Sequence, residues 1–168
     1  MDFFTGLPKS EGKSVIMMVV DRLTKHAHFC VLSHPFKAST ISISFMDTIK
    51  KLYGTPKIIV SDKDPIFTGN FWTELFSCLG TQLAHISSYH PQYDGKTEIV
   101  NKCLEVYLCF FVSDKQTQWV KWLTLVEWWY NTSFHTTIEM TLFMELYGYH
   151  PPSIASSLRD QSKVQAVE

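Results

Sequence analysis

The chain has 168 residues, 45% of them hydrophobic, which suits one folded domain with its own core and argues against disorder. Its formal net charge is −1, so it lacks the basic surplus typical of an autonomous nucleic-acid binder. No apolar run approaches the roughly 18 residues of a membrane span, and the first residues do not resemble a secretion signal. We therefore expect an intracellular protein, in the nucleus or cytoplasm, without a membrane partner.

The first part of the chain predicts an antiparallel meander of three strands, because short apolar and β-branched runs alternate with turn residues. These strands are expected at residues 1–4, 14–20 and 27–32. A helix should follow over residues 38–53, where apolar side chains recur with helical spacing and Gly54 ends the pattern.

The rest of the chain alternates between strands and helices. We expect strands at residues 57–61 and 82–86, and helices at residues 70–79, 95–112, 118–130 and 141–147. This order predicts an α/β layered fold with a mixed sheet. The segment after Pro152 is rich in serine and small residues, so we expect one domain over residues 1–152 and a flexible tail over residues 153–168.

Acidic side chains occur at the ends of several predicted elements. Asp62 ends the β run KIIVSD, where ligands gather in α/β sheets. Asp64, before a proline, is typical of a turn. Asp2 lies inside an apolar strand, which is costly without compensation, and Asp21 at the end of SVIMMVVD is its rival as a first acid. Glu98 stands in the first turn of a predicted helix.

Three carboxylates from two strands and a helix can converge on one point. Mg²⁺ and Mn²⁺ prefer such oxygen ligands, and a pair of these ions supports phosphoryl transfer. Spacing alone is weak support, because the chain holds 16 acidic residues. A carboxylate at the position of Glu98 is also explained by the helix dipole.

The other possible metal ligands favour a structural interpretation. The four cysteines show no CxxC pair, so buried reduced thiols are expected rather than a zinc site. His26, His28 and Cys30 alternate as a strand would, so they could share one face. Without a nearby fourth ligand, metal binding there is the less favoured interpretation.

Five stretches of the chain carry a family resemblance. They are MDFFTGLPKS, VVDRLTKHAHF, VSDKDPIF, YHPQYDGKTEIVNK and YNTSFHTTIEMTLFMELYG. In this order they resemble the catalytic core of integrases from retroviruses and long-terminal-repeat retrotransposons, with the gypsy-type elements most similar.

The resemblance implies a ribonuclease H-like fold, with a mixed five-stranded sheet flanked by helices, and a metal-binding triad of two aspartates and a glutamate. Thirty-five residues lie between Asp62 and Glu98, which matches the family spacing. The first family acid precedes a turn such as GLPKS, so Asp2 is preferred over Asp21. Asp2, Asp62 and Glu98 are therefore the expected catalytic residues and the ligands of two Mg²⁺ or Mn²⁺ ions.

Residues near Glu98 resemble the groups that contact DNA in this family. His90 and Gln92 match the active-site loop, and Lys96 follows it. Asn101 and Lys102 lie three and four residues after Glu98, on the same helical face. The alternative is a solvated helix face.

The later helices carry less specific signals. Asn131 and His135 match a family pattern, and a structural hydrogen-bond role is the favoured interpretation. The tryptophan-rich segment 119–129 favours core or dimer packing over base stacking. A homodimer or higher oligomer is therefore expected.

The resemblance implies metal-dependent processing of the 3′ ends of element DNA and strand transfer into target DNA. Some features depart from the family: the first strand is clipped, Tyr93 replaces a small residue, and Leu142 replaces a proline. An alternative is thus a catalytically silent remnant that binds DNA or dimerises. A ribonuclease H-type nuclease shares the fold, but the loop YHPQYDGKTE and the acid spacing argue against it.

Overall fold

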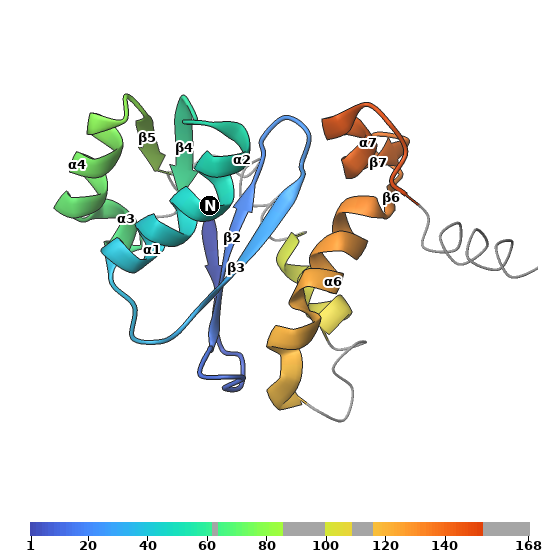
Figure 1. The fold of residues 1–168 in the computed structure, drawn as a ribbon, viewed down its shortest axis with the longest axis horizontal. Helices are drawn as coiled ribbons and strands as arrows, with labels where there is room; N and C mark the ends of the chain where they lie inside the picture. The colour runs from blue at the N-terminus through green and yellow to red at the C-terminus, as the bar shows by residue number, and fades with distance from the viewer. Residues whose placement is uncertain (62–63, 86–99, 109–115, 153–168) are drawn as a thin grey trace, which may run out of the picture.

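The computed structural model describes residues 1–61, 64–85, 100–108 and 116–152 (Figure 1). Its strands are β1 (Asp2–Phe4), β2 (Val15–Val20), β3 (Ala27–Leu32), β4 (Ile58–Ser61), β5 (Gln82–His85), β6 (Phe134–His135) and β7 (Met140–Thr141). Its helices are α1 (Ala38–Phe45), η1 (Met46–Lys50), α2 (Lys51–Tyr53), α3 (Pro65–Thr68), α4 (Asn70–Cys78), η2 (Gln116–Gln118), α6 (Trp119–Thr132) and α7 (Leu142–Tyr147), and residues 100–108 are also helical.

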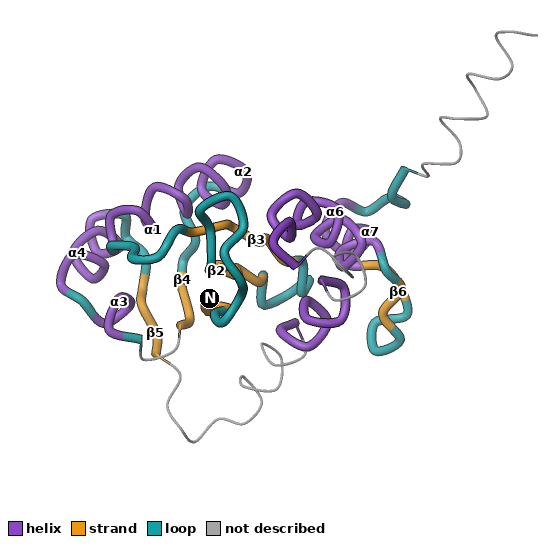
Figure 2. The backbone as a smooth tube through the Cα atoms, turned by 90° about the horizontal axis from the view of Figure 1, so that it is seen from below, coloured by secondary structure: helices purple, strands orange, loops and turns teal. Residues whose placement is uncertain are grey.

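The central strands lie side by side in the order β5, β4, β1, β2, β3 (Figure 2). The strands β1, β2 and β3 form the predicted antiparallel meander, with Asp2 opposite Met18, and β4 pairs with β5 in parallel. The amino group of Met1 donates a hydrogen bond of 2.7 Å to the carbonyl oxygen of Val60. This contact joins β1 to β4.

The expectation of one five-stranded sheet is only partly confirmed. In the described part of the chain the strands form ladders of three, two and two strands, and no continuous ladder links β1 to β4. The third ladder is the short hairpin of β6 and β7, which the sequence did not predict because each of its strands has only two residues. The α/β class itself is confirmed.

Two apolar cores cover the two faces of the sheet, because successive side chains of a strand point to opposite faces. One core joins β2 and β3 to residues 100–108, α6 and α7; it contains Ile16, Met18, Phe29, Val100, Leu104, Leu123, Val126 and Leu142. The other core joins the opposite face to α1, α3 and α4; it contains Val15, Met17, Leu32, Ile41, Phe45, Ile59, Phe67, Trp72 and Phe76. The fold therefore has three layers.

Local sequence signals explain the ends of several helices. Asp64, which we expected in a turn, caps α3 by accepting a hydrogen bond of 2.9 Å from the backbone of Ile66, and Pro65 fills the first helical position. Thr141 caps α7 in the same way, and Gly148 ends it in the left-handed conformation. Among the described helices, none is long and apolar enough to cross a membrane.

Candidate functional site

Asp2 lies on β1, in the strand that the family resemblance assigns to the first acid. Its Oδ1 accepts a hydrogen bond of 2.8 Å from the backbone N–H of Phe3, and the residue is half-buried. Met1 and Phe3 pack against the core beside α1 and α4, whereas Phe4 packs against the opposite core. Because strand side chains alternate, Asp2 faces the layer that contains residues 100–108.

The other two expected acids, Asp62 and Glu98, lie outside the described residues. Ser61, which directly precedes Asp62, is 1% exposed at the end of β4. Val100, two residues after Glu98, belongs to the same buried cluster as Met18, the residue opposite Asp2. The described neighbours of the expected triad thus lie at the junction of β1 and β4 and in the helical layer over that face.

Asp21, the rival first acid, closes the hairpin between β2 and β3. Its Oδ2 accepts hydrogen bonds from the backbone N–H and the hydroxyl of Thr24, at 2.8 and 2.7 Å. Partial burial alone would raise the pKa of Asp21, but these hydrogen bonds and the charge of Lys25 lower it below its ordinary value. The carboxylate of Asp21 is therefore held by its own turn.

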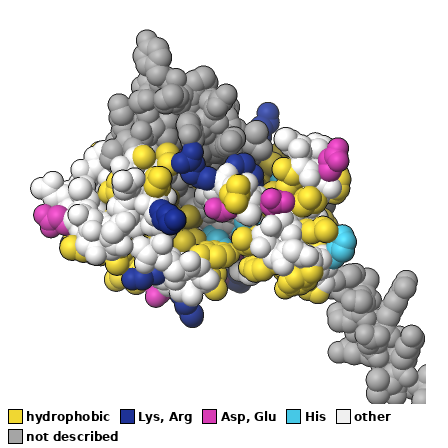
Figure 3. Space-filling view, turned by 90° about the horizontal axis from the view of Figure 1, so that it is seen from above, with side chains coloured by type: hydrophobic (Ala, Val, Ile, Leu, Met, Phe, Trp, Pro, Cys, Tyr) yellow, Lys and Arg dark blue, Asp and Glu magenta, His cyan; other side chains and the backbone are white. Residues whose placement is uncertain are grey.

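A cavity of about 740 Å³ lies between this hairpin and the beginning of β4, and both Asp2 and Asp21 line it. Its walls are mostly apolar and include Val20, Phe45, Ile49, Ile58 and Ile59. Seen from above, the surface is hollowed here, with histidine surface in the hollow and charged side chains around it (Figure 3). The cavity is large enough for a small ligand or a short peptide.

The structure locates only part of the expected DNA-contacting set. Lys102 is exposed, as a phosphate-contacting side chain should be. Asn101 is half-buried, and its Oδ1 is buried without a hydrogen-bond partner in the described part of the chain. His90, Gln92 and Lys96 lie outside the described residues. The expected roles of all five in DNA binding stay predictions.

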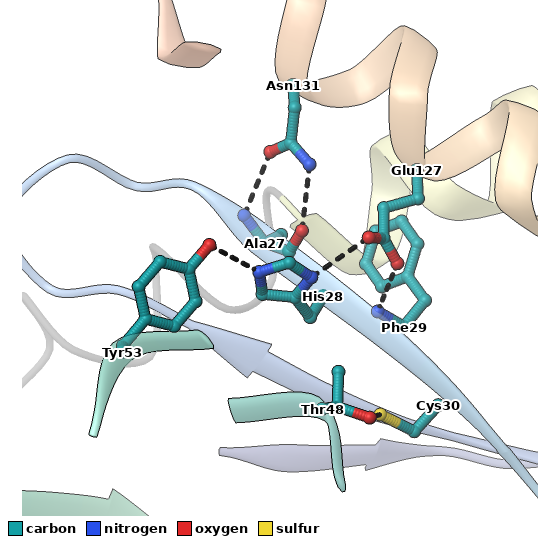
Figure 4. A network of polar contacts seen from close by, with 8 residues as sticks. All are labelled: Ala27, His28, Phe29, Cys30, Thr48, Tyr53, Glu127 and Asn131. Atoms are coloured by element: carbon teal, nitrogen blue, oxygen red, sulfur yellow. Dashed lines mark hydrogen bonds and ion pairs between the residues drawn. The ribbon is translucent and has the colours of Figure 1, made fainter. Parts of the chain in front are cut away.

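The outer edge of β3 is held by two side chains of α6 (Figure 4). Asn131 accepts a hydrogen bond of 2.9 Å from the N–H of Ala27 and donates one of 2.8 Å to its carbonyl oxygen. Glu127 accepts a hydrogen bond of 2.7 Å from the N–H of Phe29. The predicted structural role of Asn131 is confirmed, and Asn131 takes the place of a neighbouring strand.

His28 extends this network toward α2. Its Nδ1 lies 2.9 Å from Glu127 Oε1, and its Nε2 lies 2.8 Å from the hydroxyl of Tyr53 (Figure 4). Because a carboxylate only accepts, Nδ1 donates the hydrogen bond to Glu127. Burial raises the pKa of Tyr53, and a hydrogen bond with Tyr147 raises it further. The network therefore links α2, β3, α6 and α7.

The side chains of His28 and Cys30 have hydrogen-bond partners within the protein. The thiol of Cys30 contacts the hydroxyl of Thr48 at 3.4 Å, and burial raises its pKa. His26 is 6% exposed and its Nδ1 has no hydrogen-bond partner among the described residues, while burial and then the neighbouring His28 lower its pKa to about 4. Within the described ranges, no group of three histidine, cysteine or acidic residues can hold a metal ion.

Some of the cysteines and tryptophans that were expected in the core are exposed. Cys30, Cys78 and Cys103 are free, as predicted, but Cys78 is exposed rather than buried. Trp119 is buried and donates a hydrogen bond of 2.7 Å to the carbonyl oxygen of Pro8, whereas Trp129 is 48% exposed. The tryptophan-rich segment 119–129 therefore places only some of its tryptophans in the core.

Sequence reasoning missed Glu127 and Tyr53. Both act through contacts with a residue far away in the chain, so no local pattern marks them. A signal was available for Glu127, because it precedes Asn131 by four residues and therefore shares its helix face.

No family model matches the chain. The chain is 32% identical, over 151 residues, to the Tf2-3 and Tf2-4 transposon polyproteins of Schizosaccharomyces pombe. The match covers 90% of this chain and 11% of each polyprotein, so the chain spans about a tenth of the length of these relatives.

Solved structures show the same fold. A chain of the simian T-cell lymphotropic virus intasome in complex with PP2A regulatory subunit B56 gamma matches with a TM-score of 0.73 and 18% identity, over 91% of this chain and 55% of that chain. The HTLV-2 integrase catalytic core domain in complex with magnesium, in its trimeric form, matches with a TM-score of 0.67 and 14% identity, over 85% and 92%. The catalytic core domain of BIV integrase matches with a TM-score of 0.66 and 19% identity, over 87% and 92%.

The chain is therefore a homologue of a segment of the Tf2 retrotransposon polyproteins and has the fold of retroviral integrase catalytic cores, which confirms the family that its motifs resemble.

Proposed function

We propose that this chain is the catalytic core of a retrotransposon integrase. It would process the 3′ ends of element DNA and join them to target DNA, with Asp2, Asp62 and Glu98 as its catalytic residues. The observation that carries the proposal is the hydrogen bond from Met1 to Val60, because it ties the residue before Asp2 to β4 two residues before Asp62. The homology and the fold support the same assignment.

The described part of the site suits a hard divalent ion. Asp2 offers carboxylate oxygens, the donor type that Mg²⁺ and Mn²⁺ prefer, and one of these oxygens is oriented by the N–H of Phe3. Asp62 and Glu98 would complete the ligand set for two ions. Such ions would supply activation of the attacking oxygen and stabilisation of the leaving oxygen.

DNA and further copies of the chain are the proposed partners. Lys102 is exposed on the helix that follows Glu98, so it can contact a phosphate there. Asn101, Lys96, His90 and Gln92 would orient the strand near the acids. Among the structural relatives, the HTLV-2 core is described in dimeric and trimeric forms and the simian virus protein in an intasome, which supports a homodimer or higher oligomer.

A disintegration assay on branched DNA, the reverse of strand transfer, tests this function in the presence of Mn²⁺. We expect the 168-residue chain to be active and Asp2→Asn, Asp62→Asn and Glu98→Gln each to lose activity by at least about 10²-fold, since each removes a charged ligand. Asp21→Asn and Asp64→Asn are matched controls and should keep activity, provided circular dichroism shows that all variants fold. Folded but inactive wild-type protein would overturn the proposal.

The second candidate is a catalytically silent interaction domain derived from an integrase. It is favoured by the net charge of −1 and by large exposed aromatic side chains such as Trp129 and Phe134. This candidate predicts self-association without activity, so analytical ultracentrifugation beside the same assay separates the two functions.

A further inference from the structure

In the part of the chain that the structure describes, α6 closes the outer edge of β3 over only part of its length. Successive residues of an antiparallel strand direct their backbone groups alternately toward a neighbouring strand and away from it. The carbonyl oxygen of Leu32 accepts a hydrogen bond of 3.1 Å from Ser14, which directly precedes β2. The backbone groups of Val31 therefore face outward, as those of Ala27 and Phe29 do where α6 bonds them (Figure 4).

Three backbone groups of this edge have no hydrogen-bond partner among the described residues. They are the carbonyl oxygen of Phe29 and both the N–H and the carbonyl oxygen of Val31. Val31 is only half-buried. Unpaired backbone groups along a strand edge are a template for pairing with another chain.

A groove of about 300 Å³ lies beside these groups, between β3 and α6. It is lined by Phe29 and Val31 from β3 and by Val120, Leu123, Thr124 and Glu127 from α6. Most of these side chains are apolar, and the carboxylate of Glu127 marks the end of the groove at Phe29, whose N–H it accepts. The groove accommodates one aliphatic side chain next to a strand edge.

Glu127 determines which end of a chain the groove can receive. Its Oε2 lies 2.7 Å from the backbone nitrogen of Phe29, where the carbonyl oxygen of an added strand would otherwise lie, so such a strand cannot continue past Phe29. A carboxylate has about four acceptor sites, and within the described ranges Phe29 and His28 use two of them. Because the side chain of Glu127 is 26% exposed, it can also accept from an ammonium group.

We propose that this groove binds the amino-terminal end of an extended peptide from a partner molecule, with an apolar side chain at the second residue of the peptide. The terminal ammonium group donates to the carbonyl oxygen of Phe29 and to the carboxylate of Glu127. The peptide runs parallel to β3, because its first residue lies at Phe29 and its later residues lie at Val31. Addition of a strand to an exposed edge and capture of an amino terminus are both established modes of peptide recognition.

The hydrogen-bond pattern of a parallel pair places each peptide residue. The carbonyl of the first residue accepts from the N–H of Val31, and the N–H of the third residue donates to the carbonyl oxygen of Val31. The second residue lies beside Val31 and shares its face, where Val31 packs against the core next to Val120 and Leu123. The second side chain therefore enters the groove and should be apolar. This inference is independent of the proposed catalytic function.

A nuclear magnetic resonance titration of the ¹⁵N-labelled chain tests the proposal. The probe is the pentapeptide threonine–leucine–threonine–threonine–threonine, with a free amino terminus and an amidated carboxyl terminus. We expect saturable shifts of the Phe29 and Val31 amide signals. The N-acetylated peptide lacks the ammonium charge and should bind about tenfold more weakly or worse, because a charge-assisted hydrogen bond is lost.

Modified peptides test the remaining contacts one by one. Glycine in place of leucine removes the apolar side chain from the groove and should weaken binding about tenfold. Methylation of the third nitrogen removes the donor to the Val31 carbonyl and should weaken binding about fivefold or more. Methylation of the fourth nitrogen, which faces away from β3, is the matched control and should leave binding unchanged.

Two variants of the chain test the position of the groove. Thr124→Trp places a large side chain in the groove and should abolish binding of the parent peptide. Thr117→Trp makes the same change at another exposed threonine, which does not line the groove, and should leave binding intact. Circular dichroism checks that both variants fold.

The proposal is overturned by any of four results. The first three are unchanged spectra at millimolar peptide, equal binding of the acetylated and parent peptides, and shifts that leave Val31 unaffected. The fourth is a shift of the Val31 amide signal with protein concentration in the absence of peptide, because a second copy of the chain would then occupy the edge.

Discussion

Two borders of the central strands differ in what they contact. At the outer edge of β3, side chains of α6 bond the backbone of Ala27 and Phe29. Between the end of β2 and the beginning of β4, Val20 and Ile58 instead line the cavity of about 740 Å³. The difference shows that a helix can close a strand edge when its polar side chains match the strand repeat.

The match between α6 and β3 follows from helix and strand geometry. Glu127 and Asn131 are four residues apart, which is a rise of about 6 Å in a helix. Ala27 and Phe29 are two residues apart, which spans about 6.6 Å in a strand. One helix face therefore presents a bonding group to two successive outward-facing residues of β3, Ala27 and Phe29.

The hydrogen bonds of Asn131 and Glu127 to the backbone of β3 are called the α6 clamp below. The largest effect is expected when the Asn131 bonds of this clamp are removed. Asn131→Ala leaves the N–H and the carbonyl of Ala27 without their partners in a site where Asn131 is 3% exposed. We expect the free energy of unfolding to fall by about 3 kcal/mol, because two buried polar groups lose their hydrogen bonds. Urea denaturation measures this loss, with Lys121→Ala on the exposed side of α6 as the control. A change below about 1 kcal/mol would mean that the clamp does not hold the edge.

The second effect is a pH dependence near the same edge. The pKa of His26 is lowered to about 4 in the folded chain, from 6.5, by burial and by His28, while Glu127 and Asp21 oppose this shift. The folded state therefore resists protonation that the unfolded state accepts. The contribution of neutral His26 to the stability of the folded state is fully present above pH 6.5 and is lost as the pH falls toward 4.

Comparison of the wild type with His26→Phe isolates this pH dependence. Phenylalanine keeps an aromatic ring beside His28 and Tyr147 but cannot be protonated. Between pH 7 and pH 4 we expect the wild type to lose on the order of 2 kcal/mol more stability than the variant. Parallel pH profiles from thermal unfolding would contradict a buried neutral His26.

A smaller effect is expected from the second residue of the clamp. Glu127→Gln keeps an acceptor for the N–H of Phe29 but removes the charge that faces His28. We expect a loss of about 1–2 kcal/mol in the free energy of unfolding, typical of a charge-assisted hydrogen bond. Urea denaturation should show that the effect of Glu127→Gln is smaller than that of Asn131→Ala; the reverse order would mean that Glu127 is the main clamp.

The smallest effect is expected at the outer end of the network. Tyr53→Phe removes the hydroxyl that is hydrogen-bonded to Nε2 of His28, at a position that is 45% exposed. Water can replace this hydroxyl, so we expect a loss of no more than about 0.5–1 kcal/mol. A thermal unfolding scan that shows a larger loss would indicate that the network depends on α2 rather than on α6.

Much of the fold could be predicted from the sequence, because local patterns govern it. The bounds of β3 were predicted without error, and helical structure runs over residues 38–53 as expected, although residues 46–50 form a π-helical segment that the apolar spacing does not reveal. The motif around Asn131 indicated a hydrogen-bonding residue but not its partner. Glu127 and the cavity beside Asp2 depend on contacts between distant parts of the chain, which no local pattern encodes.

The most direct test of the proposed site is to determine whether Asp2 or Asp21 binds the metal ion, because both residues line the same cavity. Mn²⁺ is paramagnetic and broadens nearby amide signals of the ¹⁵N-labelled chain. We expect the signals of Phe3 and Ser61 to broaden at the lowest Mn²⁺ concentrations, and this broadening to be lost in Asp2→Asn but kept in Asp21→Asn. Broadening that begins at Thr24 and is lost only in Asp21→Asn would contradict the assignment of Asp2.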